Sequence, residues 1–275
     1  MTLDMSVNAL SRKAEERFGI KADPDDVEKL QSYILDTYDR DDQETVDKVF
    51  SSGEAADFLT VNETYFFREP VHFSFLRDLL PCYEKTGIRV CSAAVASGCE
   101  AYSIAMLIEA YNRSAEKPLP YIIDAFDINP HVIEAARRGI YSARTLREDG
   151  SSFRSLTLPY LKKTEFEGMA RYETDPLLKK YIHFFVHNLM EGLPAKDYDV
   201  IFFRNAFIYF SLRYRELILS NLIDALKGGG YLIMGVSETA GVRHTGIEGK
   251  NRDDVFYFQK PAHAGEPIYR NEIVS

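Results

Sequence analysis

The sequence predicts an α/β fold: a mostly parallel β-sheet with helices on both faces, preceded by a small all-helical domain and interrupted by a small inserted subdomain. From about residue 68, short β-rich runs alternate with helical stretches, as is typical of parallel sheets. The first 60 residues instead carry apolar residues three or four positions apart. At 275 residues, the chain is long enough to divide into two unequal domains.

Residues 1–60 are expected to form the helical domain. The apolar positions of its first two helices are Val7, Leu10, Ala14 and Phe18, then Val27, Leu30, Ile34 and Tyr38. Asp23 and Pro24 suit the start of the second helix, because an acid caps the free amides and proline fits the first turn. A third helix is predicted over residues 44–50. This segment carries no recognisable catalytic grouping, so we expect it to cover or dock something.

Residues 71–260 are expected to form the sheet domain, joined to the helical domain by a linker at 61–70. The predicted strands are 89–93, 121–126, 183–187, 199–203, 230–236 and 255–259, and the predicted helices are 71–80, 100–112, 130–138 and 212–226. Residues 141–181 break the alternation and are too many for a plain loop, so they predict the inserted subdomain. Residues 261–275 form a polar tail.

Composition restricts the class of protein. Hydrophobic residues make up 45% and charged residues 27%, which is ordinary for a folded protein. No apolar stretch approaches the ~18–20 residues that span a bilayer, and the first residues do not resemble a secretory signal. Three cysteines without a CxxC pair predict neither a disulfide framework nor a zinc site. We therefore expect a cytoplasmic protein without membrane insertion and without a metal.

The net charge of −9 is unevenly placed. Residues 1–60 hold 15 acids and 7 bases, which argues against nucleic-acid binding. Residues 137–163 are instead locally basic, with Arg137, Arg138, Arg144, Arg147, Arg154, Lys162 and Lys163. This run is either a docking patch for an acidic partner or a solvated loop region, and charge alone favours the second interpretation.

Polar residues follow four consecutive predicted strands. Glu100 opens the helix after the first strand, and Asp127 ends the second, where an acid in this kind of sheet can bind ribose hydroxyls. Alone, either acid is explained as well or better by an ordinary turn. Asn188 with Leu189 follows the third strand, Arg204 with Asn205 follows the fourth, and Tyr209 comes shortly after. Their joint placement at one sheet edge predicts a ligand site.

The linker offers a further candidate. Asn62, Thr64 and Arg68 flank the aromatic residues Phe66 and Phe67. The two rings beside polar groups indicate either a ligand lid or a linker whose phenylalanines are buried in the core.

Together these segments resemble the chemotaxis receptor glutamate methyltransferases, the CheR family. The resemblance rests on seven blocks in the family's order: residues 62–70 (NETYFFREP), 92–103 (SAAVASGCEAYS), 127–128, 188–189, 203–210 (FRNAFIYF), 230–232 and 235–238 (GVSE). It covers roughly residues 60–260, and the helical leader fits the family's N-terminal domain.

The resemblance implies a Rossmann-like, S-adenosylmethionine-dependent methyltransferase that esterifies glutamate side chains of chemoreceptors, with S-adenosylhomocysteine as product. By resemblance, nine residues would line the cofactor pocket: Asn62, Thr64, Arg68, Glu100, Asp127, Asn188, Leu189, Arg204 and Asn205. Arg68 and Tyr209 would lie nearest the methyl group and the acceptor and act in catalysis. The partner would be the cytoplasmic region of a chemoreceptor.

Two other functions stay open at this point. The acidic leader and an insert unlike the family's favour a methyltransferase for another protein or a small carboxylic acid. A non-catalytic module that senses S-adenosylmethionine or S-adenosylhomocysteine is the other, although Arg68 and Tyr209 argue against it. The lack of an evident catalytic base is compatible with catalysis, because a glutamate with a pKa near ~4.3 is already ionised at neutral pH.

Overall fold

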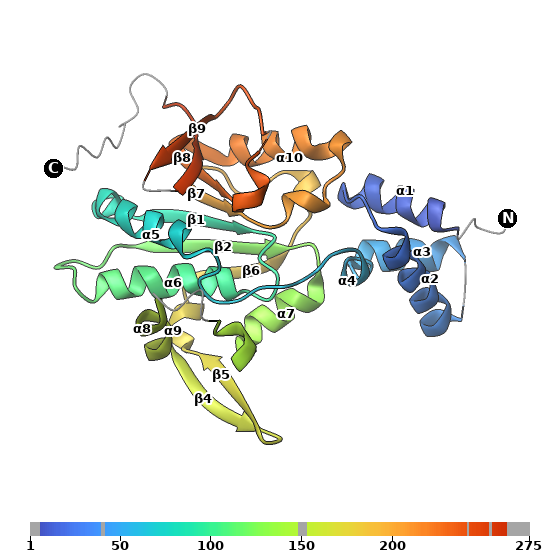
Figure 1. The fold of residues 1–275 in the computed structure, drawn as a ribbon, viewed down its shortest axis with the longest axis horizontal. Helices are drawn as coiled ribbons and strands as arrows, with labels where there is room; N and C mark the ends of the chain where they lie inside the picture. Colours follow the sequence, from blue (N-terminus) through green and yellow to red (C-terminus); the bar gives the residue numbers. More distant parts are fainter. Residues whose placement is uncertain (1–5, 40–41, 148–152, 241, 253–254, 263–275) are drawn as a thin grey trace.

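The computed structural model describes residues 6–39, 42–147, 153–240, 242–252 and 255–262. Its main sheet has seven strands in the order β6-β2-β1-β7-β8-β10-β9 (Figure 1). The strands are β1 (Ile88–Ala93), β2 (Tyr121–Asp127), β6 (Ile182–Val186), β7 (Tyr198–Phe203), β8 (Leu226–Met234), β9 (Glu248–Arg252) and β10 (Val255–Gln259). The first five strands of that order pair in parallel, and β10 runs antiparallel to both β8 and β9. The predicted α/β class is therefore confirmed.

Helices cover both faces of this sheet. One face packs against α5 (Pro70–Leu79), α6 (Cys99–Asn112) and α7 (Pro130–Arg138), and the other packs against α10 (Leu212–Ala225). Successive residues of a strand point to opposite faces, so each strand contributes to both cores. Neighbouring residues of β7 show the division, since Phe202 belongs to the first core and Phe203 to the second. Burial on both faces explains why the central strand β7, with the sequence YDVIFF, is almost entirely apolar.

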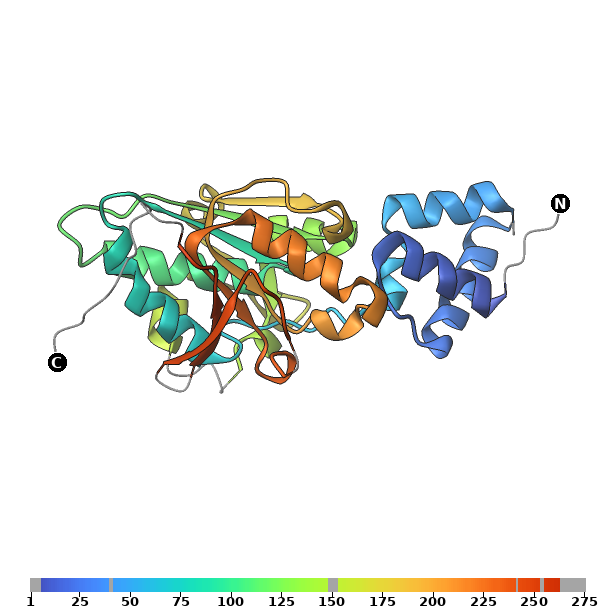
Figure 2. The same ribbon diagram turned by 90° about the horizontal axis from the view of Figure 1, so that it is seen from above.

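The N-terminal helices form a unit with its own core (Figure 2). They are α1 (Val7–Phe18), α2 (Pro24–Tyr38), α3 (Gln43–Ser52) and α4 (Ala56–Leu59). Asp23 caps α2 by accepting from the Asp25 amide at 3.0 Å, with Pro24 in the first turn, as the sequence predicts. Leu30 and Ile34 are fully buried, so the apolar face of α2 supplies much of this core.

The helical unit contacts the sheet domain through backbone pairing. The Lys21 amide donates to the Tyr209 carbonyl at 2.8 Å, and the Ser211 amide donates to the Gly19 carbonyl at 2.8 Å. Between them, Ile20 and Phe210 form an antiparallel bridge. The loop that follows β7 at the carboxyl edge of the sheet thereby becomes attached to the chain segment that follows α1.

Residues 140–174 contain a second sheet, antiparallel, in the order β3-β5-β4. Its strands are β3 (Ile140–Ser142), β4 (Leu161–Phe166) and β5 (Met169–Thr174), flanked by α8 (Arg154–Thr157) and α9 (Pro176–Lys179). Glu167 and Gly168 make the turn of the β4–β5 hairpin, both with positive φ. A segment whose sequence departs from the family's pattern thus still forms a small β-sheet.

Short 3-10 helices fill several connections: Leu80–Tyr83, Ala143–Thr145, Leu158–Tyr160, Leu189–Glu191, Phe207–Tyr209 and Val236–Glu238. The predicted helices and strands of the sheet domain are present with ends shifted by a few residues, and β9 is an addition. Within the described part of the chain, none of the helices has the length and apolar character that crossing a membrane requires.

Candidate functional site

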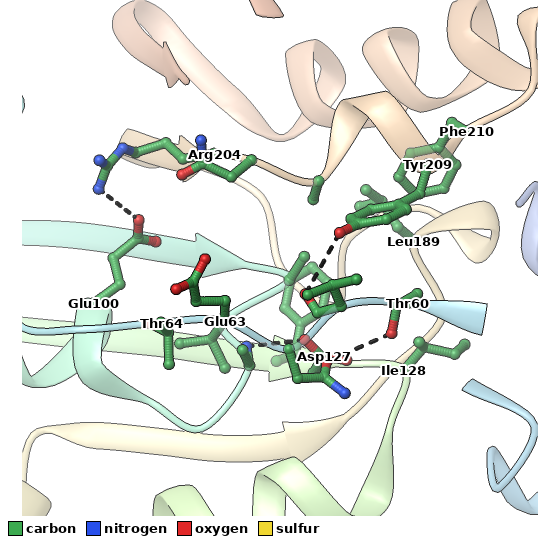
Figure 3. A pocket seen from close by; sticks show the side chains of 18 of the residues that line it. Thr60, Glu63, Thr64, Glu100, Asp127, Ile128, Leu189, Arg204, Tyr209 and Phe210 are labelled. Atoms are coloured by element: carbon green, nitrogen blue, oxygen red, sulfur yellow. Dashed lines mark hydrogen bonds and ion pairs between the residues drawn. The ribbon is translucent and has the colours of Figure 1, made fainter. Parts of the chain in front are cut away.

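A pocket lies at the carboxyl ends of β1, β2, β6 and β7, under the linker that joins the two units (Figure 3). The structure brings all nine predicted cofactor residues and Tyr209 to its wall. The lining residues with a predicted role are Asn62, Thr64, Arg68, Glu100, Asp127, Asn188, Leu189, Arg204, Asn205 and Tyr209. Parallel strands present their carboxyl ends at one edge, which explains why residues so distant in sequence meet here.

Asp127 is the last residue of β2, and its side chain is buried. The alternative interpretation of Asp127 as an exposed loop acid is therefore wrong. One carboxylate oxygen accepts from the Ala96 amide at 2.9 Å and the other from the Asn129 amide at 3.0 Å. Burial raises the pKa of Asp127, although these two amides oppose the rise. Each oxygen keeps a second lone pair, so the carboxylate can still accept from a pair of ligand hydroxyls.

The loop after β1 approaches the pocket with its backbone. Ala94 and Ala96 both adopt positive φ, at 58° and 50°, and this turn aims the Ala96 amide at Asp127. Gly98 has φ 91°, and a Cβ there would lie 2.8 Å from the Cβ of Ala136. Small residues are therefore required here both by the turn and by the packing of α6 on α7.

Glu100 lies in the first turn of α6 and forms an ion pair with Arg204. Arg204 Nη1 lies 3.0 Å from Glu100 Oε2, and the Ser92 hydroxyl donates to Oε1 at 2.6 Å (Figure 3). Burial raises the pKa of Glu100, and the Arg204 charge limits that rise. The guanidinium also lies 5.5 Å above the Phe73 ring.

Arg204 has a second carboxylate partner in Glu69, whose Oε2 is 3.4 Å from Nη2. Glu69 also accepts from the Asn205 side-chain amide at 3.1 Å and from the Val236 backbone amide at 3.2 Å. Burial would raise the pKa of Glu69, but the Arg204 charge and the Asn205 amide outweigh it and hold that pKa below its usual value. His72 Nδ1, 3.3 Å from the same carboxylate, is buried without hydrogen-bond geometry, and burial lowers the His72 pKa to about 4.

Glu238 holds the loop that carries Arg204, Asn205 and Tyr209. Its buried carboxylate accepts three backbone amides: Asn205 at 2.6 Å, Gly235 at 3.0 Å and Ile208 at 3.3 Å. Asn205 itself adopts φ 57°, a conformation that these bonds keep in place.

The linker crosses the pocket, and its side chains divide between the pocket and the core. Asn62, Thr64 and Arg68 line the pocket. Phe66 and Phe67 are buried in the core, where Phe67 stacks on Phe153 with ring centroids 4.7 Å apart. The interpretation of these two rings as a ligand lid is therefore wrong, and the alternative of buried linker rings is the correct one.

Arg68 and Tyr209 differ in how they are held. Arg68 is half-buried; its Nη1 donates to the Glu63 carbonyl at 2.8 Å and its guanidinium lies 5.6 Å from the Tyr65 ring centre. Among the described residues, no carboxylate forms an ion pair with it. The Tyr209 hydroxyl points across the pocket to the Val61 carbonyl, at a long 3.5 Å (Figure 3). Both side chains thus keep donor capacity for a ligand.

Asn188 and Leu189 complete the wall near the helical unit. The Asn188 amide donates to the Arg17 carbonyl at 2.8 Å, while its oxygen accepts from the Met190 amide at 3.0 Å. Leu189 is buried beside them. Asn188 is consequently occupied in joining the pocket to α1.

Sequence reasoning missed two residues that line this wall and two that support it from behind. Phe18 and Ile20 line the pocket from the helical unit, and no sequence pattern predicts how that unit docks. Glu69 and Glu238 lie inside the motif blocks of the sequence, so their position in those blocks was a usable signal. Among the described residues, no cluster of metal-ligating side chains is present.

The arrangement fits S-adenosylmethionine. Asp127 offers acceptors for a pair of hydroxyls, apolar side chains such as Ile128 and Phe126 can cover a flat ring, and Glu100 brings negative charge near a cationic group. Because Arg204 neutralises much of that charge, a zwitterionic ligand is better matched than a simple cation.

Comparisons with known proteins identify the family to which this geometry corresponds. The family model described as CheR methyltransferase, SAM binding domain, matches residues 62–252. A chemotaxis protein methyltransferase from Vibrio parahaemolyticus is 36% identical over 192 residues, which are 67% of each chain. A chemotaxis protein methyltransferase from Borreliella burgdorferi is 36% identical over 199 residues, 68% of this chain and 67% of that one. Among solved structures, a magnesium protoporphyrin IX methyltransferase from Synechocystis aligns with 70% of this chain and 77% of its own, at 14% identity and a TM-score of 0.37.

Proposed function

The chain belongs to the CheR methyltransferase family and is an S-adenosylmethionine-dependent methyltransferase, and from this premise we propose that it methylates glutamate side chains of chemoreceptors. The site of action would be the cytoplasmic region of the receptor. The names of its relatives support a chemotaxis role, and the pocket supports a carboxylate as acceptor.

The observation that carries the acceptor assignment is Arg68. Its guanidinium stands at the pocket wall, half-buried, and is bonded to a backbone carbonyl instead of a carboxylate. A planar guanidinium matches the two oxygens of a carboxylate, so an incoming glutamate is the partner that this position suits. Arg204, in contrast, is already engaged by Glu69 and Glu100.

The reaction does not require the protein to remove a proton from the acceptor. The bound S-adenosylmethionine supplies an electrophilic methyl group, and a glutamate is ionised at neutral pH because its reference pKa is about 4.3. Arg68 would orient the acceptor carboxylate, and the walls would exclude water from it. Arg68 must not bind the carboxylate of the substrate too strongly, since that carboxylate loses its charge as the ester forms.

The remaining residues would hold the cofactor. We assign Asp127 to the ribose hydroxyls, and Glu100, Arg204 and Asn205 to the charged end. Asn62, Thr64, Asn188 and Leu189 would complete the enclosure. Tyr209 would donate its hydroxyl hydrogen bond near the methyl donor or the acceptor, since its present contact with Val61 is long.

The test is transfer of a labelled methyl group. The protein is incubated with methyl-labelled S-adenosylmethionine and a cytoplasmic chemoreceptor fragment, and the product is treated with alkali. Methyl esters release volatile labelled methanol, so alkali-labile label on the fragment is expected. A matched fragment whose acceptor glutamates are replaced by glutamine should take up none.

A methyltransferase for another protein or a small carboxylic acid is the second candidate, favoured by the excess of 8 negative charges that the 15 acids and 7 bases of residues 1–60 leave. Such a surface repels acidic receptor segments. Alkali-labile label on an acceptor other than the receptor would favour it. Alkali-stable label would contradict carboxyl methylation altogether.

A further inference from the structure

Two guanidiniums lie over one tyrosine ring at the pocket. Arg68, from the linker, is 5.6 Å from the centre of the Tyr65 ring, and Arg147, which follows β3 and its short 3-10 helix, is 4.4 Å from it. The Phe66 amide donates to the Thr145 carbonyl at 2.9 Å, which fixes the linker against the chain segment that carries Arg147. Both guanidiniums therefore contact the same aromatic ring, that of Tyr65.

Glu63 contacts both guanidiniums. Arg147 is paired with the Glu63 carboxylate, and Arg68 is bonded to the Glu63 backbone carbonyl. Among the described residues, Arg68 thus has no carboxylate of its own at this place. Both members of the Arg147–Glu63 pair are about half exposed, at 46% and 52%. An exposed pair of this kind contributes little, so a better-placed carboxylate can replace Glu63.

We propose that Arg147 is a docking residue for the protein substrate and binds a second carboxylate that neighbours the methylated glutamate. The inference rests on the proposed function, in which Arg68 takes the acceptor. It names the recognised partner by its chemistry: an acidic segment with two carboxylates one helical turn apart.

The spacing supports this partner. The two guanidinium carbons are separated by no more than the sum of their distances to the ring centre, 5.6 Å and 4.4 Å. Side chains three or four positions apart on a helix have Cβ atoms about 5–6 Å apart, so two such carboxylates can reach both arginines together. Guanidiniums resting on an aromatic ring are also pre-positioned, which reduces the entropy that docking costs.

The distribution of charge points the same way. The helical unit carries the acid excess, whereas Arg147 lies in the basic run of residues 137–163. In Figure 1 the helical unit and the small β-sheet extend from different sides of the main domain. An acidic segment is therefore drawn to the side of the pocket where Tyr65 and the neighbouring Arg147 lie, and away from the helical unit.

The experiment measures steady-state methylation of a cytoplasmic receptor fragment by wild type, Arg147→Ala and Arg147→Lys. The matched control is Arg138→Ala, which removes an exposed arginine on α7 whose carboxylate neighbour, Glu134, is 3.7 Å away. We expect Arg147→Ala to raise KM for the fragment about tenfold with kcat nearly unchanged. Arg147→Lys should recover part of the loss, and Arg138→Ala should match wild type. Binding of S-adenosylhomocysteine should be the same in all four proteins, which excludes misfolding.

A second fragment isolates the contact. It keeps the acceptor glutamate, but the carboxylates three and four positions away are replaced by glutamine. On this fragment the Arg147→Ala penalty should disappear, because the partner of Arg147 is gone. An unchanged penalty, or equal KM values for Arg147→Ala and Arg138→Ala on the first fragment, overturns the inference and leaves the proposed function intact. Failure of the wild type to form alkali-labile esters overturns both.

Discussion

The carboxylate of Glu238 accepts a 2.6 Å hydrogen bond from the backbone amide of Asn205 and so ties the end of β8 to the loop after β7. The same carboxylate accepts the amides of Gly235 and Ile208. One buried acid therefore fixes the loop in which Arg204 and Tyr209 stand. The positions of Arg204 and Tyr209 therefore depend on Glu238, which does not itself line the pocket.

Replacing Glu238 by glutamine tests that role. An amide must present its NH₂ group to one of the backbone donors, so at least one buried amide loses its acceptor, at a cost of about 1–3 kcal/mol. We expect lower stability and about a tenfold lower kcat. Glu248→Gln, at an exposed position of β9, is the matched control and should leave both unchanged. Full activity in a Glu238→Gln protein that is measurably less stable would show that the acid supports the fold alone.

Arg68→Ala should separate catalysis from cofactor binding. If Arg68 aligns the acceptor, its loss should lower kcat about 100-fold, because small misplacements of reacting groups carry penalties of this size. The dissociation constant of S-adenosylhomocysteine should change only a few-fold, as measured by calorimetry. Arg68→Lys should stay closer to the alanine variant than to wild type, since lysine lacks the planar fork. Equal losses in transfer and in cofactor binding would assign Arg68 to the cofactor instead.

Asp127→Asn should have the opposite profile. The Ala96 and Asn129 amides each donate to one oxygen of Asp127, so an asparagine side chain leaves one of them facing an NH₂ group. With a ribose acceptor also lost, we expect the affinity for S-adenosylhomocysteine to fall about 10- to 100-fold. Asp224→Asn, at an exposed position of α10, serves as the control. An unaltered affinity in Asp127→Asn would remove this residue from the cofactor site.

How much of the site could be predicted from the sequence depends on the range of the contacts. The ends of parallel strands meet by a general rule, so Glu100, Asp127, Asn188 and Arg204 could be grouped without coordinates. The pairing of Arg204 with Glu69 could not be predicted, because it depends on the path of the linker over the sheet. Nor could burial of Phe67, since the pattern of the linker fits a lid and a core segment equally well.

The helical unit shows the same limit. Its helices follow from apolar spacing and from the Asp23–Pro24 start, both of which are local signals. Its contribution of Phe18 and Ile20 to the pocket depends on backbone pairing with residues near Tyr209, which leaves no mark in the sequence. Likewise β4, with the sequence LKKTEF, alternates too weakly to reveal a strand.

His72 should make stability depend on pH. Burial lowers its pKa to about 4 in the folded protein, whereas the unfolded chain has the ordinary value of 6.5. Between these values the unfolded state binds a proton that the folded state does not, so the free energy of unfolding falls as pH falls from 6.5 toward 4. The shift predicts a loss of about 2 kcal/mol between pH 7 and pH 5. Glu69, whose pKa is lowered from 4.5, adds its own loss only at pH values near or below 4.5.

Urea unfolding of wild type and His72→Gln at pH 7 and pH 5 measures this contribution. Glutamine does not titrate, so the difference in unfolding free energy between the two pH values should shrink by about 2 kcal/mol in the variant. His131→Gln is the control, because it removes another histidine whose side chain is 64% exposed. If the pH dependence of His72→Gln equals that of wild type, protonation of His72 in the unfolded chain is not what weakens the protein in mild acid.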